Sequence, residues 1–375
     1  MADRLTALRA ALDGAGLDAI FVSSPVDDVH RHHSQNRRYL TGFTGSTGYA
    51  LVTRDAAWLA VDGRYAQQAR DEAGPRGFNI FDTRGPQDRW MPVFLHEAGA
   101  TGRRLGISTA DWSYEAFLRL ARIIDDMPHT ERPELVPAPP IIQRLRAHKD
   151  PQEIATIERA IGIALAAFGE VRPTLAPGVT ELEVADALES AMKRRGARGH
   201  AFEPIVAFGE RGAMPHARLS DRPLREGEPV IIDWGAEVDG YCSDLTRSFL
   251  IGAEPPRFRE IYDIVALAQR TAIERVEAGM TGAQAHALAA GVIAAAGYGD
   301  HFTHGLGHGV GLDVHDYPPY LGPSSEDILE EGMVFTIEPG IYVPGWGGVR
   351  IEDIVVLEEG GRARSLSARS APAGA

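Results

Sequence analysis

The spacing of apolar residues divides the first 135 residues into short segments of alternating type. Apolar side chains recur every three to four residues in some segments, as on one face of a helix, and form short β-branched or aromatic runs in others. The helical segments are residues 2–14, 64–72, 88–98 and 113–124, and the strand-like runs are residues 19–23, 48–53, 57–62 and 104–108. This alternation predicts an α/β domain.

A proline-rich segment interrupts this pattern. Residues 132–140 hold four prolines in nine positions, which neither a helix nor a central strand accommodates. We therefore predict an N-terminal domain at residues 1–135, a linker at 136–148, a second domain at 149–360 and a loose tail at 361–375.

The second domain combines helices with glycine-rich hairpins. Asp150, Pro151 and Glu153 are typical of a helix start, with a capping side chain, a proline at the first helical position and a capping-box glutamate. Further helices are predicted at residues 181–194, 256–277 and 282–296, and the remainder reads as sheet. This mixture favours an α+β fold.

Composition excludes several classes of protein. The chain has 38 Lys and Arg against 52 Asp and Glu, a formal net charge of −14, which argues against nucleic acid or an anionic membrane as a partner. There is one cysteine, Cys242, so an intrachain disulfide is excluded. We see no spanning or targeting segment and expect a cytoplasmic protein.

A predicted hairpin brings two carboxylates together. Two strand-like runs flank Asp239-Gly240, a dipeptide favoured in two-residue turns. If the hairpin closes there, Thr246 faces Asp233, Gly235 faces Asp244, and the two aspartates share a face about 7 Å apart. Such a pair could hold a cation, and we expect Gly235 to leave room for it. The alternative is that Asp233 pairs with an arginine such as Arg247 and that Asp244 is a turn residue.

Histidines and further carboxylates follow. His304, His308 and His315 lie among glycines at every second position, which discourages a helix and admits a ligand close to the backbone. Glu338 ends an apolar run before Pro-Gly, and Arg350 and Glu352 share a face of a predicted strand. Each of these residues also has an alternative, purely structural role. The histidines could be hydrogen-bonded structural residues, Glu338 a surface residue before a turn, and Arg350 and Glu352 an ion pair.

Taken together, the candidates suggest a metal centre. Four carboxylates buried with one imidazole repel one another unless cations compensate them, and two divalent ions supply four positive charges against four negative. An oxygen-rich donor set favours manganese-like ions over a thiolate-type zinc site. The candidate ligands are Asp233, Asp244, His308, Glu338 and Glu352.

At these residues the chain resembles the pita-bread metallopeptidases, which include aminopeptidase P, prolidase and methionine aminopeptidase. The N-terminal stretch at residues 38–48, followed by 62–65, is similar to the N-terminal domain of creatinase and aminopeptidase P. The resemblance implies a pita-bread catalytic domain, a creatinase-like N-terminal domain, a proline-containing peptide substrate and, as in many relatives, a homodimer.

The resemblance also implies roles. Asp233, Asp244 and Glu352 would hold one metal ion, and Asp244, His308, Glu338 and Glu352 the other, with Mn²⁺ expected and Co²⁺ or Zn²⁺ as alternatives; the ions would activate a water molecule. Glu338 would shuttle the proton, His216 and His315 would contact the substrate, and His304 would be an outer histidine of the pocket. Arg350 and Tyr342 would support the ligands.

Specificity divides the family. Prolidases grip the dipeptide carboxylate with an arginine shortly after the histidine matching His315, but residues 316–349 contain no Lys or Arg. We therefore favour an Xaa-Pro aminopeptidase, with an Xaa-Pro dipeptidase as the alternative if Arg37 or Arg38 replaces that arginine. A non-catalytic binding module of the same fold is a distant alternative. The cluster His30, His32 and His33 is expected to be a solvated loop.

Overall fold

The computed structural model describes residues 4–23 and 35–367, which belong to two compact units, Met1–Leu145 and Arg146–Ala375. The two units are described separately. The predicted histidine cluster at residues 30–33 lies outside the described residues.

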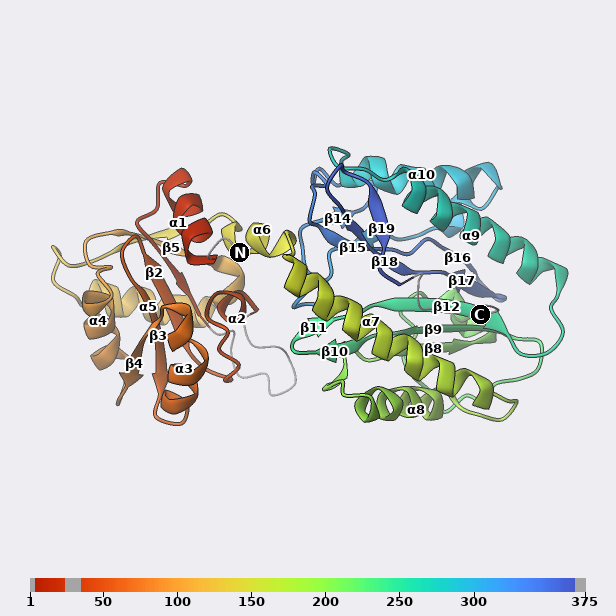
Figure 1. Cartoon of the computed structure of the whole chain (residues 1–375), viewed down its shortest axis with the longest axis horizontal. Helices are drawn as coiled ribbons and strands as arrows, with labels where there is room; N and C mark the ends of the chain where they lie inside the picture. The colour runs from red at the N-terminus through yellow and green to blue at the C-terminus, as the bar shows by residue number, and fades with distance from the viewer. Residues whose placement is uncertain (1–3, 24–34, 368–375) are drawn as a thin grey trace. The chain divides into compact units, whose positions relative to one another are not determined.

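The first unit is built on a six-stranded mixed sheet with the order β4-β3-β2-β1-β5-β6 (Figure 1). Apolar faces of its helices pack on this sheet, around an aromatic cluster that includes Phe21, Phe94 and Trp112. The strands are β1 (Ala19–Val22), β2 (Tyr49–Thr53), β3 (Ala57–Asp62), β4 (Asn79–Thr83), β5 (Arg104–Ile107) and β6 (Glu134–Pro137), and the helices are α1 (Arg4–Gly14), α2 (Gln35–Thr41), α3 (Ala66–Glu72), α4 (Gln87–Glu97) and α5 (Tyr114–Asp125).

The sheet of the first unit extends beyond the predicted boundary at residue 135. Strand β6 runs parallel to β5, with Pro137 opposite Ile107. A proline is tolerated here because β6 is the edge strand and needs no amide hydrogen on its outer side. The segment predicted as a linker therefore contains the end of a strand and the helix α6 (Ile141–Ala147).

The second unit places strands between two pairs of helices (Figure 1). Helices α7 and α8 pack on β8, β9 and β12, whereas α9 and α10 pack on β15 to β18. The helices are α7 (Pro151–Val171), α8 (Glu181–Arg194), α9 (Pro256–Arg275) and α10 (Gly282–Ala295). The strands are β7 (Gly199–His200), β8 (Ile205–Phe208), β9 (Pro229–Trp234), β10 (Ala236–Val238), β11 (Tyr241–Cys242), β12 (Leu245–Leu250), β13 (Gly307–His308), β14 (Tyr320–Leu321), β15 (Val334–Ile337), β16 (Gly340–Val343), β17 (Gly347–Arg350), β18 (Asp353–Leu357) and β19 (Ala363–Ser365).

The predicted start of α7 is confirmed. The Asp150 carboxylate accepts from the amides of Gln152 and Glu153, and the Glu153 side chain accepts from the Asp150 amide. The second Glu153 oxygen accepts from the Tyr241 hydroxyl at 2.7 Å. One capping box thus both begins the helix and ties it to the hairpin β10–β11.

The predicted register of the central hairpin is confirmed as well. Val238 pairs with Tyr241 across the turn, and Asp233 faces Thr246 in the pairing of β9 with β12. The reason we gave for Gly235 is wrong, however. A Cβ atom at Gly235 would lie 1.8 Å from the Ser243 carbonyl oxygen, so the glycine admits a neighbouring backbone, not a cation.

Residues 361–367, which we predicted as the start of a loose tail, include a strand and buried side chains. Strand β19 pairs antiparallel with β18, Leu366 is buried in the core, and the Ser367 hydroxyl donates to Asp353 at 2.6 Å. All three positions of this short strand are half-buried, so the sequence carries no alternating hydrophobic pattern that would predict it.

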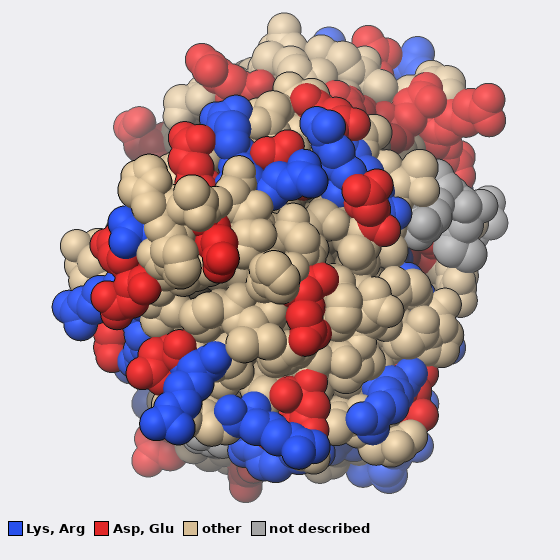
Figure 2. All heavy atoms as spheres, turned by 90° about the vertical axis from the view of Figure 1, so that its left-hand side faces the viewer, with Lys and Arg blue, Asp and Glu red and all other residues tan. Residues whose placement is uncertain are grey.

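The surface drawn in Figure 2 intersperses basic and acidic side chains around a broad uncharged area. Among the described residues, none of the helices combines the length and the apolar character that a membrane span requires.

Two glycine-to-alanine substitutions should shift stability in opposite directions. Gly235→Ala forces a methyl group into the Ser243 carbonyl and should destabilise the protein by about 1–3 kcal/mol. Gly162→Ala lies within α7 with open space around its Cβ position, and should stabilise by about 0.5–1 kcal/mol. Urea unfolding followed by circular dichroism measures both shifts in midpoint, and equal midpoints would contradict the packing described at Gly235.

Candidate active site

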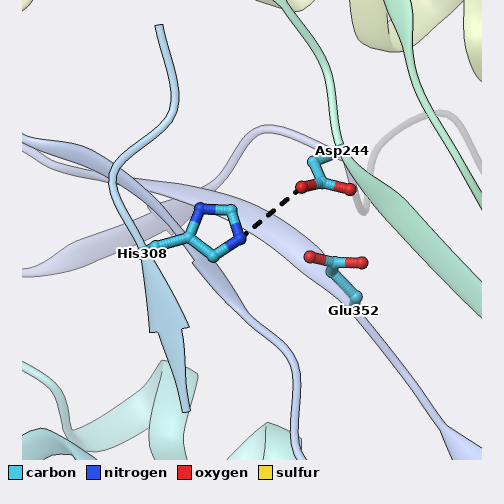
Figure 3. Close-up of side chains that lie close together, drawn as sticks. All are labelled: Asp244, His308 and Glu352. Atoms are coloured by element: carbon cyan, nitrogen blue, oxygen red, sulfur yellow. Dashed lines mark ion pairs between the residues drawn. The ribbon is translucent and has the colours of Figure 1, made fainter. Parts of the chain in front are cut away.

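Three buried side chains from separate parts of the second unit point toward one another (Figure 3). Asp244 directly precedes β12, His308 lies in β13, and Glu352 follows β17 and forms a bridge with Thr246 of β12. One donor atom from each lies within 4.8 Å of the others. The donors thus come from three places in the chain: the residue before β12, the short strand β13, and the segment between β17 and β18.

His308 presents an unprotonated nitrogen to two carboxylates. Its Nδ1 lies 3.2 Å from the Gly309 carbonyl oxygen, which requires Nδ1 to carry the hydrogen. Nε2 then offers a lone pair, 3.6 Å from Asp244 Oδ2 and 3.4 Å from Glu338 Oε1. Burial lowers the pKa of His308 to about 3, assisted by the neighbouring His315. Three acceptors therefore face one point, and a cation at that point would turn repulsion into attraction.

The separation of these donors suits a metal ion. Ligand atoms about 2.1 Å from one ion, at angles near 90–110°, lie about 3.0–3.5 Å from each other. The His308–Glu338 distance of 3.4 Å falls in that range and is long for a good hydrogen bond. Glu338 is further held by the Thr336 hydroxyl at 3.3 Å, and burial raises its pKa to about 8.

Asp233 has one oxygen satisfied and one free. Arg350 Nη2 donates to Asp233 Oδ2 at 2.7 Å, while the buried Oδ1 has no hydrogen-bond partner among the described residues. The proposed alternative pairing with Arg247 is wrong, because Arg247 pairs with Asp353 at 2.9 Å. An orphaned carboxylate oxygen beside Asp244 fits a further ligand to a cation.

Arg350 links this carboxylate to the rest of the site. Its Nε donates to Thr246 Oγ1 at 3.0 Å, and Thr246 donates to Glu352 at 2.6 Å. Its Nη1 donates to the Tyr342 hydroxyl at 2.9 Å. One guanidinium therefore orients Asp233 directly and Glu352 through a threonine.

The network continues to His304. Its Nδ1 lies 2.7 Å from the Gly305 carbonyl oxygen, so Nδ1 donates, and Nε2 accepts from the Tyr342 hydroxyl at 2.8 Å. Burial raises the pKa of Tyr342 to about 12, which keeps this hydroxyl a donor. Burial, together with Arg350, lowers the pKa of His304 to about 4. The predicted supporting residues Arg350 and Tyr342 thus contact one another, and Tyr342 contacts His304.

The carboxylates of the site compete for protons. Burial raises the pKa of Asp244 and Glu352 well above the ordinary values, and repulsion from each other and from Asp233 and Glu338 adds to it. Burial also raises the pKa of Asp233, which Arg350 partly offsets. Carboxylates that are reluctant to ionise together become stable anions when divalent cations replace the protons. The residues present therefore fit a metal centre.

A cavity of about 450 Å³ opens above these groups. His216 and His315 line it with Glu338, as do apolar side chains from Phe202, Ile205 and Leu219. The edge of the His315 ring meets His308, with centroids 4.2 Å apart. Of the ten predicted site residues, all except Tyr342 line this cavity.

Sequence reasoning missed several residues of the site. Thr246 is fully buried between Arg350 and Glu352, and its position two residues after Asp244 on the same strand face could have identified it. Arg218 lines the cavity two residues after His216, but no local pattern marks it. Tyr317 and Tyr320 line the cavity beyond His315, in the segment noted only for lacking basic residues.

Comparison with known proteins agrees with this geometry. Residues 155–359 match metallopeptidase family M24, and residues 4–148 match the creatinase/prolidase N-terminal domain. The Xaa-Pro dipeptidase of Pyrococcus furiosus is 36% identical over 97% of each chain. Among solved structures, the Xaa-Pro dipeptidase from Bacillus anthracis is 35% identical with a TM-score of 0.88, covering 98% of this chain and 97% of that one, and the X-Pro aminopeptidase from Thermotoga maritima is 33% identical with a TM-score of 0.83, covering 94% and 96%.

The pita-bread fold and its buried Asp, His and Glu donors define a metallopeptidase with a metal-dependent site. The chain belongs to metallopeptidase family M24 and, within it, to the Xaa-Pro peptidase branch, with a creatinase-type N-terminal domain. The fold and the enzyme class predicted from the sequence are confirmed.

Replacing Arg350 by lysine should weaken metal binding. A lysine ammonium cannot contact Asp233, Thr246 and Tyr342 together, and loss of such supporting contacts typically costs about 10–100-fold in metal affinity. Arg222→Lys is the matched control, because Arg222 pairs with Glu228 outside the site. Titration calorimetry with Mn²⁺ measures both variants; an unchanged dissociation constant in Arg350→Lys would contradict the proposed support.

Proposed function

We propose that this chain is an Xaa-Pro aminopeptidase, which removes an N-terminal residue that precedes proline. The observation that supports this choice is the cavity wall after His315. Residues 316–349 contain no Lys or Arg, and the residues of this segment that line the cavity next to His315 include Tyr317 and Tyr320. A dipeptidase needs a cation for the free carboxylate of its substrate, because a charge that leaves water unpaired is expensive.

A second candidate, an Xaa-Pro dipeptidase, is favoured by one observation. Of the arginines lining the cavity, Arg350 is occupied by Asp233, but Arg218 is exposed and has no ion pair among the described residues. Arg218 could take the place of the arginine that is missing after His315. Arg37, which we considered for that role, donates instead to the carbonyl oxygens of Gly45 and Gly48 within its own unit.

We infer that two divalent ions serve the reaction, with manganese expected and cobalt or zinc as alternatives. Asp233, Asp244 and Glu352 would hold one, and Asp244, His308, Glu338 and Glu352 the other. Bound there, the ions supply Lewis acidity that makes a water molecule a nucleophile at neutral pH and orients it.

Side chains of the cavity would transfer the proton and stabilise the negative charge that develops on the substrate carbonyl. Glu338 lines the cavity beside His308 and is suited to accept the water proton and return it to the leaving proline nitrogen. His216 and His315 line the cavity and can donate to the carbonyl oxygen as it gains negative charge. Burial lowers the pKa of His315, so it acts as a neutral donor. His304 and Arg350 line the cavity, and the Tyr342 hydroxyl is hydrogen-bonded to both.

Metal removal should abolish hydrolysis and Mn²⁺ should restore it. Dialysis against a chelator leaves four buried carboxylates with one ion-paired arginine, Arg350, among the described residues, so we expect both loss of activity and a lower melting temperature. Titration with Mn²⁺ should then give two ions per chain in the native protein and one in Asp233→Asn. A native stoichiometry below one with full activity would exclude the metal centre.

The two candidate activities separate on three substrates. An aminopeptidase should cleave Ala-Pro-Ala with a kcat/KM at least about tenfold above that for Ala-Pro, because the dipeptide carboxylate finds no paired cation. If Arg218 grips that carboxylate, Arg218→Gln should raise KM for Ala-Pro about 10–100-fold and leave Ala-Pro-amide unchanged. Arg225→Gln, an exposed arginine of the same segment, is the control. Exclusive cleavage of Ala-Pro by the native enzyme would reverse our choice.

A further inference from the structure

A second buried ionic cluster lies beside the active site and has no part in the proposed metal centre. Arg146 and Lys149, just before α7, meet Asp313 and Asp316 of the loop that carries His315. Arg146 Nη2 lies 2.5 Å from Asp313 and 2.8 Å from Asp316 Oδ1, and Lys149 Nζ lies 3.6 Å from Asp316 Oδ2. Two cations thus balance two anions.

Lys149 is an unusual residue for this chain. The sequence holds only two lysines among its 38 basic residues, and this one has a side chain that is 1% exposed. Its ammonium has no hydrogen-bond partner among the described residues, and burial lowers its pKa although Asp316 opposes this. Burying a poorly paired ammonium lowers the stability of a fold, so its presence points to a role that outweighs this cost. Elsewhere the chain uses arginine for its buried cations.

The packing around Asp316 is tight. A Cβ atom at Gly311 would lie 2.2 Å from Asp316 Oδ2 and 2.9 Å from Lys149 Cε. A Cβ atom at Gly309 would lie 2.1 Å from the Asp316 carbonyl oxygen, and the Asp316 amide donates to the Gly309 carbonyl at 2.7 Å. The loop therefore folds tightly on itself around the Asp316 carboxylate.

The direction of His315 follows from this arrangement. Asp316 is 3% exposed and faces the two cations, whereas its neighbour His315 is exposed and lines the cavity. His315 and Asp316 are joined by one planar peptide unit, so the position of the Asp316 backbone limits where the His315 side chain can lie. Anchoring Asp316 from within the protein thus fixes where His315 stands in the cavity.

We propose that Lys149 and Arg146 are positioning residues for His315. They act through Asp316, with which both form ion pairs. This inference rests on the proposed function, in which His315 contacts the substrate carbonyl. His308 has supports of its own, since its amide donates to Thr336 and β13 pairs with β14, so metal binding should survive when the cluster is broken.

The test is a double-mutant cycle between Lys149 and His315. Lys149→Met, which keeps the stem and removes the charge, should lower kcat/KM for Ala-Pro-Ala about 10–100-fold, because small misplacements of a substrate-contacting group are costly. In an His315→Ala background the same substitution should change kcat/KM less than about twofold, because the effect acts through His315. In Lys149→Met, the Mn²⁺ dissociation constant should stay within about threefold of the native value although kcat/KM falls. Lys193→Met, a surface lysine paired with Glu189, is the control and should change nothing.

The outcomes separate the two proposals. An inactive native enzyme with full metal content would overturn the proposed function. An active native enzyme in which Lys149→Met is equally harmful with and without His315 would overturn the positioning role. If Lys149→Met does not fold, Arg146→Lys replaces it in the double-mutant cycle with His315. This substitution keeps the positive charge but shortens the side chain, so we expect a smaller decrease in kcat/KM.

Discussion

Mutual repulsion among buried carboxylates is the constraint on which the second unit depends. Asp233, Asp244, Glu338 and Glu352 are gathered where burial raises the pKa of all four, and like charge raises it further for Asp244, Glu338 and Glu352. One guanidinium, that of Arg350, is ion-paired with this group, through Asp233. A single positive charge cannot balance four carboxylates, so the site is poised to bind cations and is unstable as a set of free anions. The surrounding fold must be strong enough to hold that arrangement together.

Rigidity around the site comes from bonds that cross between sheets. Thr246 joins the hairpin β9–β12 to Glu352, and the Ser248 hydroxyl accepts from the Arg350 amide and donates to the Arg350 carbonyl. Two helix pairs pack outside these strands and bury their apolar faces. Preorganised ligands of this kind reduce the ordering that metal and substrate would otherwise have to bring about on binding.

Polar networks extend the centre in two directions. Toward one side, Arg350, Tyr342 and His304 form a hydrogen-bonded line to the cavity. Toward the other, the ionic cluster of Arg146, Lys149 and Asp316 lies behind His315. Both networks join side chains that are far apart in the sequence, and each ends at or next to a residue that lines the cavity.

Local patterns in the sequence were sufficient for much of the fold and for the ligand candidates. The start of α7 and the hairpin register from Asp239-Gly240 follow from short-range rules, since a turn dictates which residues face each other. The five candidate ligands came from local motifs and a family resemblance, and three of them, Asp244, His308 and Glu352, meet in the structure. Only the tertiary structure decided the partners of charged groups: Asp233 with Arg350 and not Arg247, Arg218 on the cavity wall, and Lys149 against Asp316. Such pairings join residues up to 167 positions apart, as for Arg146 and Asp313, and no local periodicity encodes which distant side chains meet.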